Sequence, residues 1–230
     1  MNREKPRQEI EDAITAGNGR RLLEISGLLH GHFCPGSAMG VRAAMRAVQE
    51  MKSTATGMEE VIAIVETNSC FADGVQMVTG CSLGNNGLIY RDYGKTALVL
   101  AHRNGEGVRV TIKPGSNPVQ QNPEAAALYQ KVITERNGTP EEDEKLRKLW
   151  IDLSFDMMDI PDDELLNVKK VTADIPAYAR MFGSAICSVC GESIMEPRAR
   201  LKDGNPICLG CCTEEYYELN GNGMHIMRHG

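Results

Sequence analysis

The sequence lacks the features that place a protein in a membrane, in a secretory pathway or on a nucleic acid. No apolar run approaches the roughly 20 residues that cross a bilayer. The N-terminal stretch MNREKPRQEIEDAIT is charged, whereas a secretory signal has an apolar segment. The formal net charge of -6 also argues against a broad phosphate-binding surface, which needs clustered Lys and Arg. We therefore predict a cytoplasmic protein with no membrane contact and no nucleic-acid partner.

The sequence also lacks a phosphate-binding loop, a dinucleotide fingerprint, an internal repeat and a low-complexity segment. Its hydrophobic content of 42% and charged content of 24% are ordinary for a globular protein. At 230 residues the chain is long enough for one sizeable domain and a small appendage.

Cysteine is the residue that stands out, with eight in the chain. In a cytosolic protein this number favours metal or thiol chemistry over a disulfide framework. Three cysteines, Cys34, Cys70 and Cys81, stand apart, and the other five lie in the last fifth of the sequence. This jump in cysteine density predicts a core domain over residues 1–184 and a small domain over residues 185–230.

The C-terminal cysteines form two pairs with the spacing of a structural zinc site. Cys187-x2-Cys190 and Cys208-x2-Cys211 are separated by 17 residues, and two such pairs present four thiolates tetrahedrally to Zn²⁺. Residues 195–202 supply the intervening hairpin, and a short helix is expected to begin at Cys211 and to run through Tyr217, as in a treble-clef finger. Four protein ligands leave no open position, so this zinc is structural. Cys212 lies outside the pairs, and His225 and His229 are interpreted as part of a polar tail.

Hydrophobic periodicity predicts helices and strands for the larger domain. Helices are expected over residues 20–29, 35–51, 71–80, 122–138 and 139–155, and strands over 61–67, 88–94, 96–103, 107–114 and 165–172. The three strands between residues 88 and 114 follow one another with Gly-rich turns, which indicates an antiparallel meander.

The stretch HGHFCPG, residues 30–36, is the main candidate for chemistry in this domain. In an extended segment, His30, His32 and Cys34 point to one face. Pro35 disfavours the helical region for Cys34, which favours the extended form. Cys34 then lies just before a helix N-terminus, where the dipole and free N–H groups favour its thiolate.

Three ligands from one segment need a fourth from elsewhere, and Cys70 is the natural candidate because it precedes a short helix. Cys81, after the end of that helix, is less clearly placed. The alternative is that Cys70 and Cys81 are buried small hydrophobic residues, a common place for free cysteine.

The stretches HGHFCPGSAMGVRAAM, ETNSCFADGVQMVTGCSLGNNGLIYRDYGKTAL and GEGVRV together resemble the FmdE-like family, which takes its name from a formylmethanofuran dehydrogenase. The resemblance spans about residues 25–113, and the four-cysteine module resembles the treble-clef finger of some members. It implies an α+β fold with helices packed on a mainly antiparallel sheet, a homodimer, and association with a molybdenum or tungsten dehydrogenase. It also implies a metal or active site from His30, His32, Cys34, Cys70 and Cys81, with Asp73 and Lys95 as nearby polar candidates.

Three hypotheses follow for the core. In the first, His and Cys ligands hold Zn²⁺ or another soft metal, since mixed imidazole and thiolate ligation suits zinc and not magnesium or calcium. In the second, Cys34 is a nucleophile for redox or sulfur-transfer chemistry, with His30 or His32 as base and Cys70 or Cys81 resolving. In the third, the chain is an accessory protein of a dehydrogenase complex and has no turnover of its own.

Overall fold

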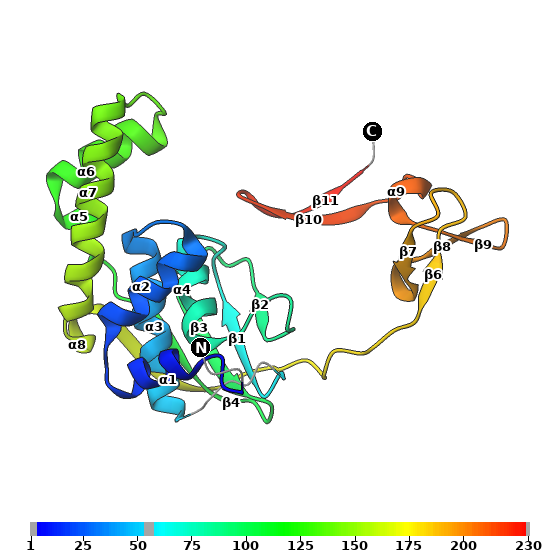
Figure 1. The fold of residues 1–230 in the computed structure, drawn as a ribbon, viewed down its shortest axis with the longest axis horizontal. Helices are drawn as coiled ribbons and strands as arrows, with labels where there is room; N and C mark the ends of the chain where they lie inside the picture. Colours follow the sequence, from blue (N-terminus) through cyan, green and yellow to red (C-terminus); the bar gives the residue numbers. More distant parts are fainter. Residues whose placement is uncertain (1–3, 53–57, 229–230) are drawn as a thin grey trace. The chain divides into compact units, whose positions relative to one another are not determined.

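The computed structural model describes residues 4–52 and 58–228. The chain forms two compact units, Met1–Pro176 (unit 1) and Ala177–Gly230 (unit 2), and Figure 1 shows the elements of each. The boundary between the units falls after Pro176, whereas the jump in cysteine density places the domain boundary at residues 184 and 185.

A five-stranded sheet forms the centre of unit 1, with the strand order β2-β1-β3-β4-β5. The strands are β1 (Val61–Val65), β2 (Leu88–Tyr90), β3 (Ala97–His102), β4 (Glu106–Ile112) and β5 (Leu166–Thr172). Every residue of β1 is buried, because this strand has a neighbour on each side and apolar layers on both faces. The pairings β1–β3, β3–β4 and β4–β5 are antiparallel, so the predicted α+β fold with a mainly antiparallel sheet is confirmed.

The predicted antiparallel meander between residues 88 and 114 is wrong at its first strand, β2. β2 does not pair with β3, and it lies parallel to β1 with Ile64 opposite Ile89. The reason is α4 (Cys70–Thr79), which connects β1 to β2 as a crossover helix. A helical crossover returns the chain in the same direction, so the two strands that it joins are parallel.

Four helices lie on one side of the sheet. They are α1 (Gln8–Thr15), α2 (Gly19–His30), α3 (Pro35–Met51) and α4, and the last three lie together in Figure 1. Of these helices, α3 and α4 lie directly against the strands. Their apolar side chains form the main core with the inward residues of the strands, among them Val108 and Val110. This large core gives unit 1 its own stability, since apolar burial is the main favourable term in folding.

The second face of the sheet has a thinner cover. Ile62, Ile64, Val99 and Ala101 are buried there against Val171, Ala173 and Ile175, which lie at the end of β5 and after it. Arg91, just after β2, donates a hydrogen bond to the Asp174 carbonyl at 3.0 Å. The chain after β5 therefore crosses this face toward the opposite edge of the sheet.

A helical segment is inserted between β4 and β5. It contains α5 (Pro118–Gln121), α6 (Pro123–Tyr129), a π-helical turn η1 (Gln130–Thr134), α7 (Pro140–Asp156), η2 (Met157–Asp159) and α8 (Asp162–Leu165). Asn122 caps α6, and Thr139 with Glu142 forms the predicted capping box of α7. No helix in residues 4–52 and 58–228 is long and apolar enough to cross a membrane.

Arg42 ties the end of this inserted segment to α3. Its guanidinium is buried and donates to the carbonyls of Met157 and Ile160 at 2.5 and 2.6 Å and to the Asp162 carboxylate at 2.7 Å. Carbonyls at a helix C-terminus lack the usual partners within the helix, and Arg42 supplies donors to three of them at the end of this segment, those of Met157, Met158 and Ile160.

Unit 2, as far as the structure describes it, is built from three small hairpins and two short helical turns. Its elements are β6 (Ser184–Ile186), β7 (Ser193–Met195), η3 (Glu196–Arg198), β8 (Arg200–Lys202), β9 (Asn205–Ile207), α9 (Leu209–Cys212), β10 (Tyr216–Asn220) and β11 (Gly223–Met227). Asp203 and Gly204 both have positive φ, as a two-residue type I′ turn requires. The predicted helix through Tyr217 is wrong, because α9 ends at Cys212 and Tyr217 lies in β10, paired with Ile226.

Candidate functional site

The turn between α2 and α3 brings His30 and Cys34 together. His30 is the last residue of α2, and Gly31 ends the helix with φ of 83°, a conformation that glycine adopts without a Cβ penalty. Cys34 is extended, at φ -145° and ψ 154°, and is the N-cap of α3 before Pro35. The prediction that His30, His32 and Cys34 lie in one extended segment is therefore wrong at His30, although the extended form of Cys34 is confirmed.

Close packing of α3 on α4 brings Cys70 to the same place. A Cβ on Gly40 would lie 2.1 Å from the Phe71 carbonyl oxygen, so only glycine permits this approach. At Gly36 a Cβ would lie 3.0 Å from the Cβ of Cys70 and 3.7 Å from the Sγ of Cys34. Cys34 precedes α3 and Cys70 begins α4, so the two thiols meet where the helices start.

A chain of short contacts links the polar side chains of the site. The Sγ of Cys34 lies 3.4 Å from Nε2 of His30, and Nδ1 of His30 lies 2.7 Å from a carboxylate oxygen of Asp73 in α4. The rings of His30 and His32 are 4.4 Å apart. One ligand atom from each of His30, His32 and Cys34 lies within 4.8 Å of the others, so one ion can reach all three.

The electrostatics of the site favour a single thiolate on Cys34. The hydrogen bond from Cys70 and another from the backbone N–H of Ser37 lower the pKa of Cys34 to about 4, although burial acts in the opposite direction. The same interaction with Cys34, together with burial, raises the pKa of Cys70. Burial opposes protonation of His30, but Asp73 and the Cys34 thiolate outweigh it and raise the pKa of His30.

Two kinds of chemistry fit this arrangement. Typical zinc bond lengths place a sulfur and a nitrogen ligand about 3.5 Å apart in a tetrahedral site, close to the 3.4 Å between Cys34 and His30. A carboxylate on the other nitrogen of a ligating histidine, as Asp73 provides, is usual in metal sites. A thiolate, an imidazole and a carboxylate in line also form an activated nucleophile.

The other residues singled out from the sequence lie elsewhere. Cys81 is not brought to the group, because its sulfur contacts the Val61 carbonyl at 3.6 Å. Cys70 and Cys81 lie at opposite ends of α4, a ten-residue helix about 15 Å long. Lys95 lies just before β3, where it lines a separate cavity.

Sequence reasoning missed Trp150, which contributes to the surroundings of the site from α7. Its ring stacks on His32 at a centroid distance of 6.0 Å, and Tyr129 approaches it at 6.3 Å. Trp150 is the only tryptophan in the sequence, but it is distant in sequence from the histidines and no local pattern marks this contact.

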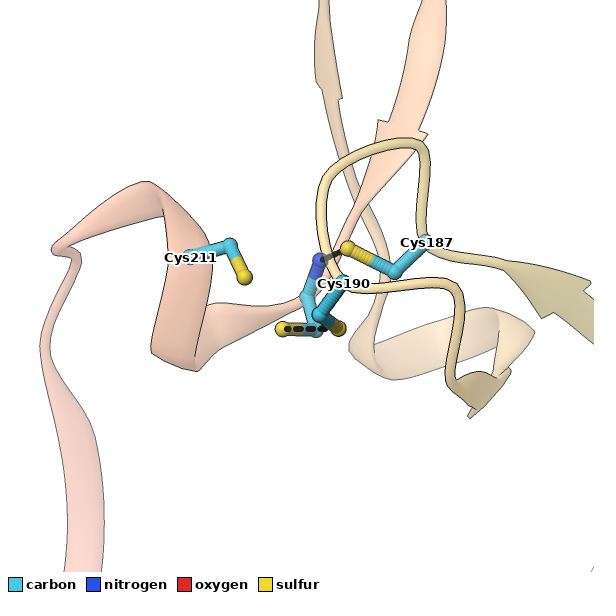
Figure 2. A group of neighbouring side chains, drawn as sticks. Cys187, Cys190 and Cys211 are labelled. Carbon is cyan, nitrogen blue, oxygen red and sulfur yellow. Dashed lines mark hydrogen bonds between the residues drawn. The ribbon is translucent and has the colours of Figure 1, made fainter.

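The four paired cysteines of unit 2 form a second cluster. One sulfur from each of Cys187, Cys190, Cys208 and Cys211 lies within 4.8 Å of the others, and Figure 2 shows the first two on one loop and Cys211 on the helical turn α9. Backbone hydrogen bonds from Cys190 and then from Cys208, whose N–H donates to the sulfur of Cys187 at 3.4 Å, lower the pKa of Cys187 to about 6.

Two further residues of unit 2 lie outside this cluster. Cys212 contacts the Leu209 carbonyl at 3.5 Å. His225 lies in β11 opposite Glu218, and His229 lies outside the described residues.

Comparison with known proteins assigns both units. Residues 29–167 match the family model described as "FmdE, Molybdenum formylmethanofuran dehydrogenase operon". Residues 180–217 match the model described as "Prokaryotic dksA/traR C4-type zinc finger".

Two similar proteins extend this result. A "Probable S-adenosyl-L-methionine-binding protein" of Archaeoglobus fulgidus is 37% identical over 220 residues, which are 94% of this chain and 58% of that protein. This chain therefore spans little more than half the length of that relative. The crystal structure of a "tungsten formylmethanofuran dehydrogenase subunit e (fmde)-like protein" from Syntrophus aciditrophicus has a TM-score of 0.52 and 25% identity, and the match covers 84% of this chain and 91% of that chain.

The match to the first family model covers more than half of the chain. It includes all the candidate site residues of unit 1, from His30 to Lys95. This chain therefore belongs to the FmdE family and carries a C4-type zinc finger in its C-terminal unit.

Proposed function

We propose that the chain is a zinc protein with two different sites, and that unit 1 holds an exchangeable or catalytic metal through His30, His32 and Cys34. The main support for this proposal is that one ligand atom from each of these three residues lies within 4.8 Å of the others. In addition, Asp73 holds Nδ1 of His30 at 2.7 Å and so orients the imidazole ring. Zn²⁺ is the natural ion for two imidazoles and one thiolate.

The protonation states support an open coordination position. Cys34 is a thiolate at neutral pH, whereas the raised pKa of Cys70 keeps that thiol protonated beside it. Three protein ligands and a free position are typical of catalytic zinc, which activates a water molecule or polarises a carbonyl group. Cys70 then serves as a neighbouring proton donor to Cys34, or as a fourth ligand when the site closes.

The zinc finger of unit 2 is structural in this proposal. Its four thiols leave no free position, and its small core has three buried residues among those described, Cys187, Ile194 and Ile207, so the metal holds the fold. The names of the related proteins mention molybdenum and tungsten dehydrogenases, and we propose an accessory role beside such an enzyme. The family resemblance also predicts a homodimer, which sedimentation of the purified chain tests.

One specific observation favours a second function. Cys34 contacts His30, His30 contacts Asp73, and the thiol of Cys70 lies next to Cys34. In this alternative the Cys34 thiolate attacks a substrate disulfide, whose S–S bond breaks and releases one half as a thiolate. Cys70 gives its proton to that thiolate and attacks the mixed disulfide at Cys34, which releases the other half; the substrate is reduced, and Cys34 and Cys70 are oxidised to a disulfide. This chemistry needs no metal in unit 1, so metal content separates it from the first proposal.

Metal analysis of the purified chain tests the proposal. We expect two zinc ions per chain, one of them removed by mild chelation, and Cys34→Ser retains only the zinc of the finger because it removes the one thiolate ligand of unit 1. Cys212→Ser, which removes a thiol outside both clusters, serves as the matched control and keeps both ions.

One zinc ion in the wild-type chain, with unchanged metal content in Cys34→Ser, rejects the core metal site. If the wild-type chain in addition forms a Cys34–Cys70 disulfide with a mild oxidant, the thiol function replaces the metal function.

A further inference from the structure

A cavity of about 560 Å³ opens at the edge of unit 1 where β3 begins and β4 ends. It is distinct from the His and Cys cluster, none of whose ligands lines it. The residues that matter for its chemistry are Lys95, Arg109, Lys113, Asn117, Gln120 and Asn167. They come from the turn before β3, from β4 and the inserted segment after it, and from β5.

The charged side chains that line the cavity are all positive. Among the described residues, three cations line it and no carboxylate does. Within residues 4–52 and 58–228, neither Lys95 nor Lys113 forms an ion pair, although the ammonium group of Lys113 donates to the carbonyl of Asp163. A carbonyl is neutral, so this contact orients Lys113 without cancelling its charge.

Arg109 is held rigidly in the wall of the cavity by a buried partner. Its Nε and Nη2 donate to the two carboxylate oxygens of Glu66 at 3.0 and 2.6 Å, and Glu66 is only 5% exposed. Such a two-point contact fixes the plane of the guanidinium. The group has five N–H donors, so the N–H groups of Nη1 remain for a ligand.

A like charge opposite Arg109 adds to the positive field. Lys169 in β5 is its direct partner in the antiparallel register, and like charges at opposed positions of a sheet are destabilising. Glu66 already compensates the charge of Arg109, so the excess of positive charge comes from the lysines. The local excess of positive charge contrasts with the net charge of -6 for the whole chain.

The remaining lining defines the size and character of the ligand. The side chains of Gln120 and Asn167 and the hydroxyl groups of Thr96 and Thr111 offer hydrogen bonds, whereas Met39 and Ile112 supply an apolar wall. A site with a few polar groups and an apolar side is typical of small-molecule binding.

We propose that this cavity binds a small organic anion through a phosphate or carboxylate group, with Lys95, Lys113 and Arg109 as the charged contacts. The proposal goes beyond the metal site, because it assigns a second ligand to unit 1 through residues that hold no metal. Lysine binds such groups as a point charge, and arginine adds directional hydrogen bonds.

Nuclear magnetic resonance titration of the full chain with inorganic phosphate and, separately, with succinate tests the proposal. We expect saturable shifts of the side-chain amide signals of Gln120 and Asn167 with at least one probe. A stronger response to phosphate identifies a phosphate-bearing ligand, and a stronger response to succinate identifies a carboxylate-bearing one.

Single charge removals locate the site. Lys95→Gln and Lys113→Gln are each expected to weaken binding about tenfold, since each removes one charge-assisted contact. Lys170→Gln is the matched control, because Lys170 is exposed, does not line the cavity and lies opposite Val108; it is expected to change the affinity less than about twofold.

The proposal is overturned if neither probe gives saturable shifts, or if Lys170→Gln weakens binding as much as Lys95→Gln does. If Lys113→Gln fails to fold after losing its contact with Asp163, Lys95→Gln decides, because the Lys95 side chain is exposed. Zinc content plays no part in this readout, so failure here leaves the proposed metal function untouched.

Discussion

The two cysteine-containing sites of this chain stand in different kinds of surroundings. In unit 2 Cys187 is one of three buried residues of a very small core, and Cys208 and Cys211 pack against it. In unit 1 the His and Cys side chains lie at the ends of helices that a large apolar core already fixes. The cysteines of unit 2 therefore contribute to the stability of their unit, whereas the apolar core of unit 1 positions the cysteines of the candidate site.

This difference indicates why unit 1 is the better candidate for chemistry. A site that holds its protein together cannot release its metal without unfolding. A site positioned by independent packing can lose, exchange or oxidise its ligands while the framework persists. The charged neighbours of Cys34, from His30 to Asp73, are consistent with such a reactive role.

The largest effect is expected from removing the metal of unit 2. Structural zinc contributes an apparent free energy of about 10–16 kcal/mol in small zinc modules, which exceeds what three buried residues provide. A strong chelator is therefore expected to unfold residues 177–230 while unit 1 retains its dispersed amide spectrum. If unit 2 stays folded without metal, or unit 1 unfolds with it, the contrast between the two sites is wrong.

A smaller loss of stability is expected from a substitution at the close contact between α3 and α4 in unit 1. Gly40→Ala places a Cβ 2.1 Å from the Phe71 carbonyl oxygen, and overpacking of this kind costs about 3 kcal/mol. Urea unfolding is expected to show this loss in unit 1, with the zinc of the finger unchanged. Gly17→Ala is the control, since a Cβ there meets nothing within 4 Å and its φ of 66° costs only about 1 kcal/mol. Equal losses in both variants contradict the importance of the close approach.

The smallest structural change is the gain or loss of one proton, on Cys34 in the metal-free chain. The pKa of Cys34 falls from an ordinary 9.0 to about 4 on folding, so the folded state binds fewer protons than the unfolded state between these values. The thiolate therefore contributes stability that is complete above about pH 9 and is lost as the pH falls through about 4. Thiolate absorbance, measured as wild type minus Cys34→Ser, is expected to persist at neutral pH; a midpoint near the ordinary thiol value would contradict the assignment.

The sequence predicts the finger well because its information is local. The Cys-x2-Cys pairs form tight knuckles, and the Asp203-Gly204 dipeptide marks the turn of the hairpin between them. Each of these features depends on neighbours a few residues away, so spacing alone brings the thiols together. The helix predicted from Cys211 through Tyr217 is wrong, because a stretch this short fits a strand and a helix almost equally.

The core site depends on packing that spacing does not encode. The approach of Cys70 to Cys34 requires the crossing of α3 and α4, for which Gly40 and Gly74 are the only local signs. Cys70 and Cys81 are both candidates from the sequence for the further ligand, yet they lie at opposite ends of α4. The contact of Trp150 with His32 joins residues more than a hundred positions apart and has no local signal.

Arg42 links α3 to the helix that contacts His32. It has no contact with His30, His32 or Cys34 in the hydrogen bonds described above, yet its guanidinium holds the residues just after α7, the helix whose Trp150 stacks on His32. Substitution of this single buried cation is therefore expected to loosen the end of α7 while every candidate ligand of unit 1 stays the same.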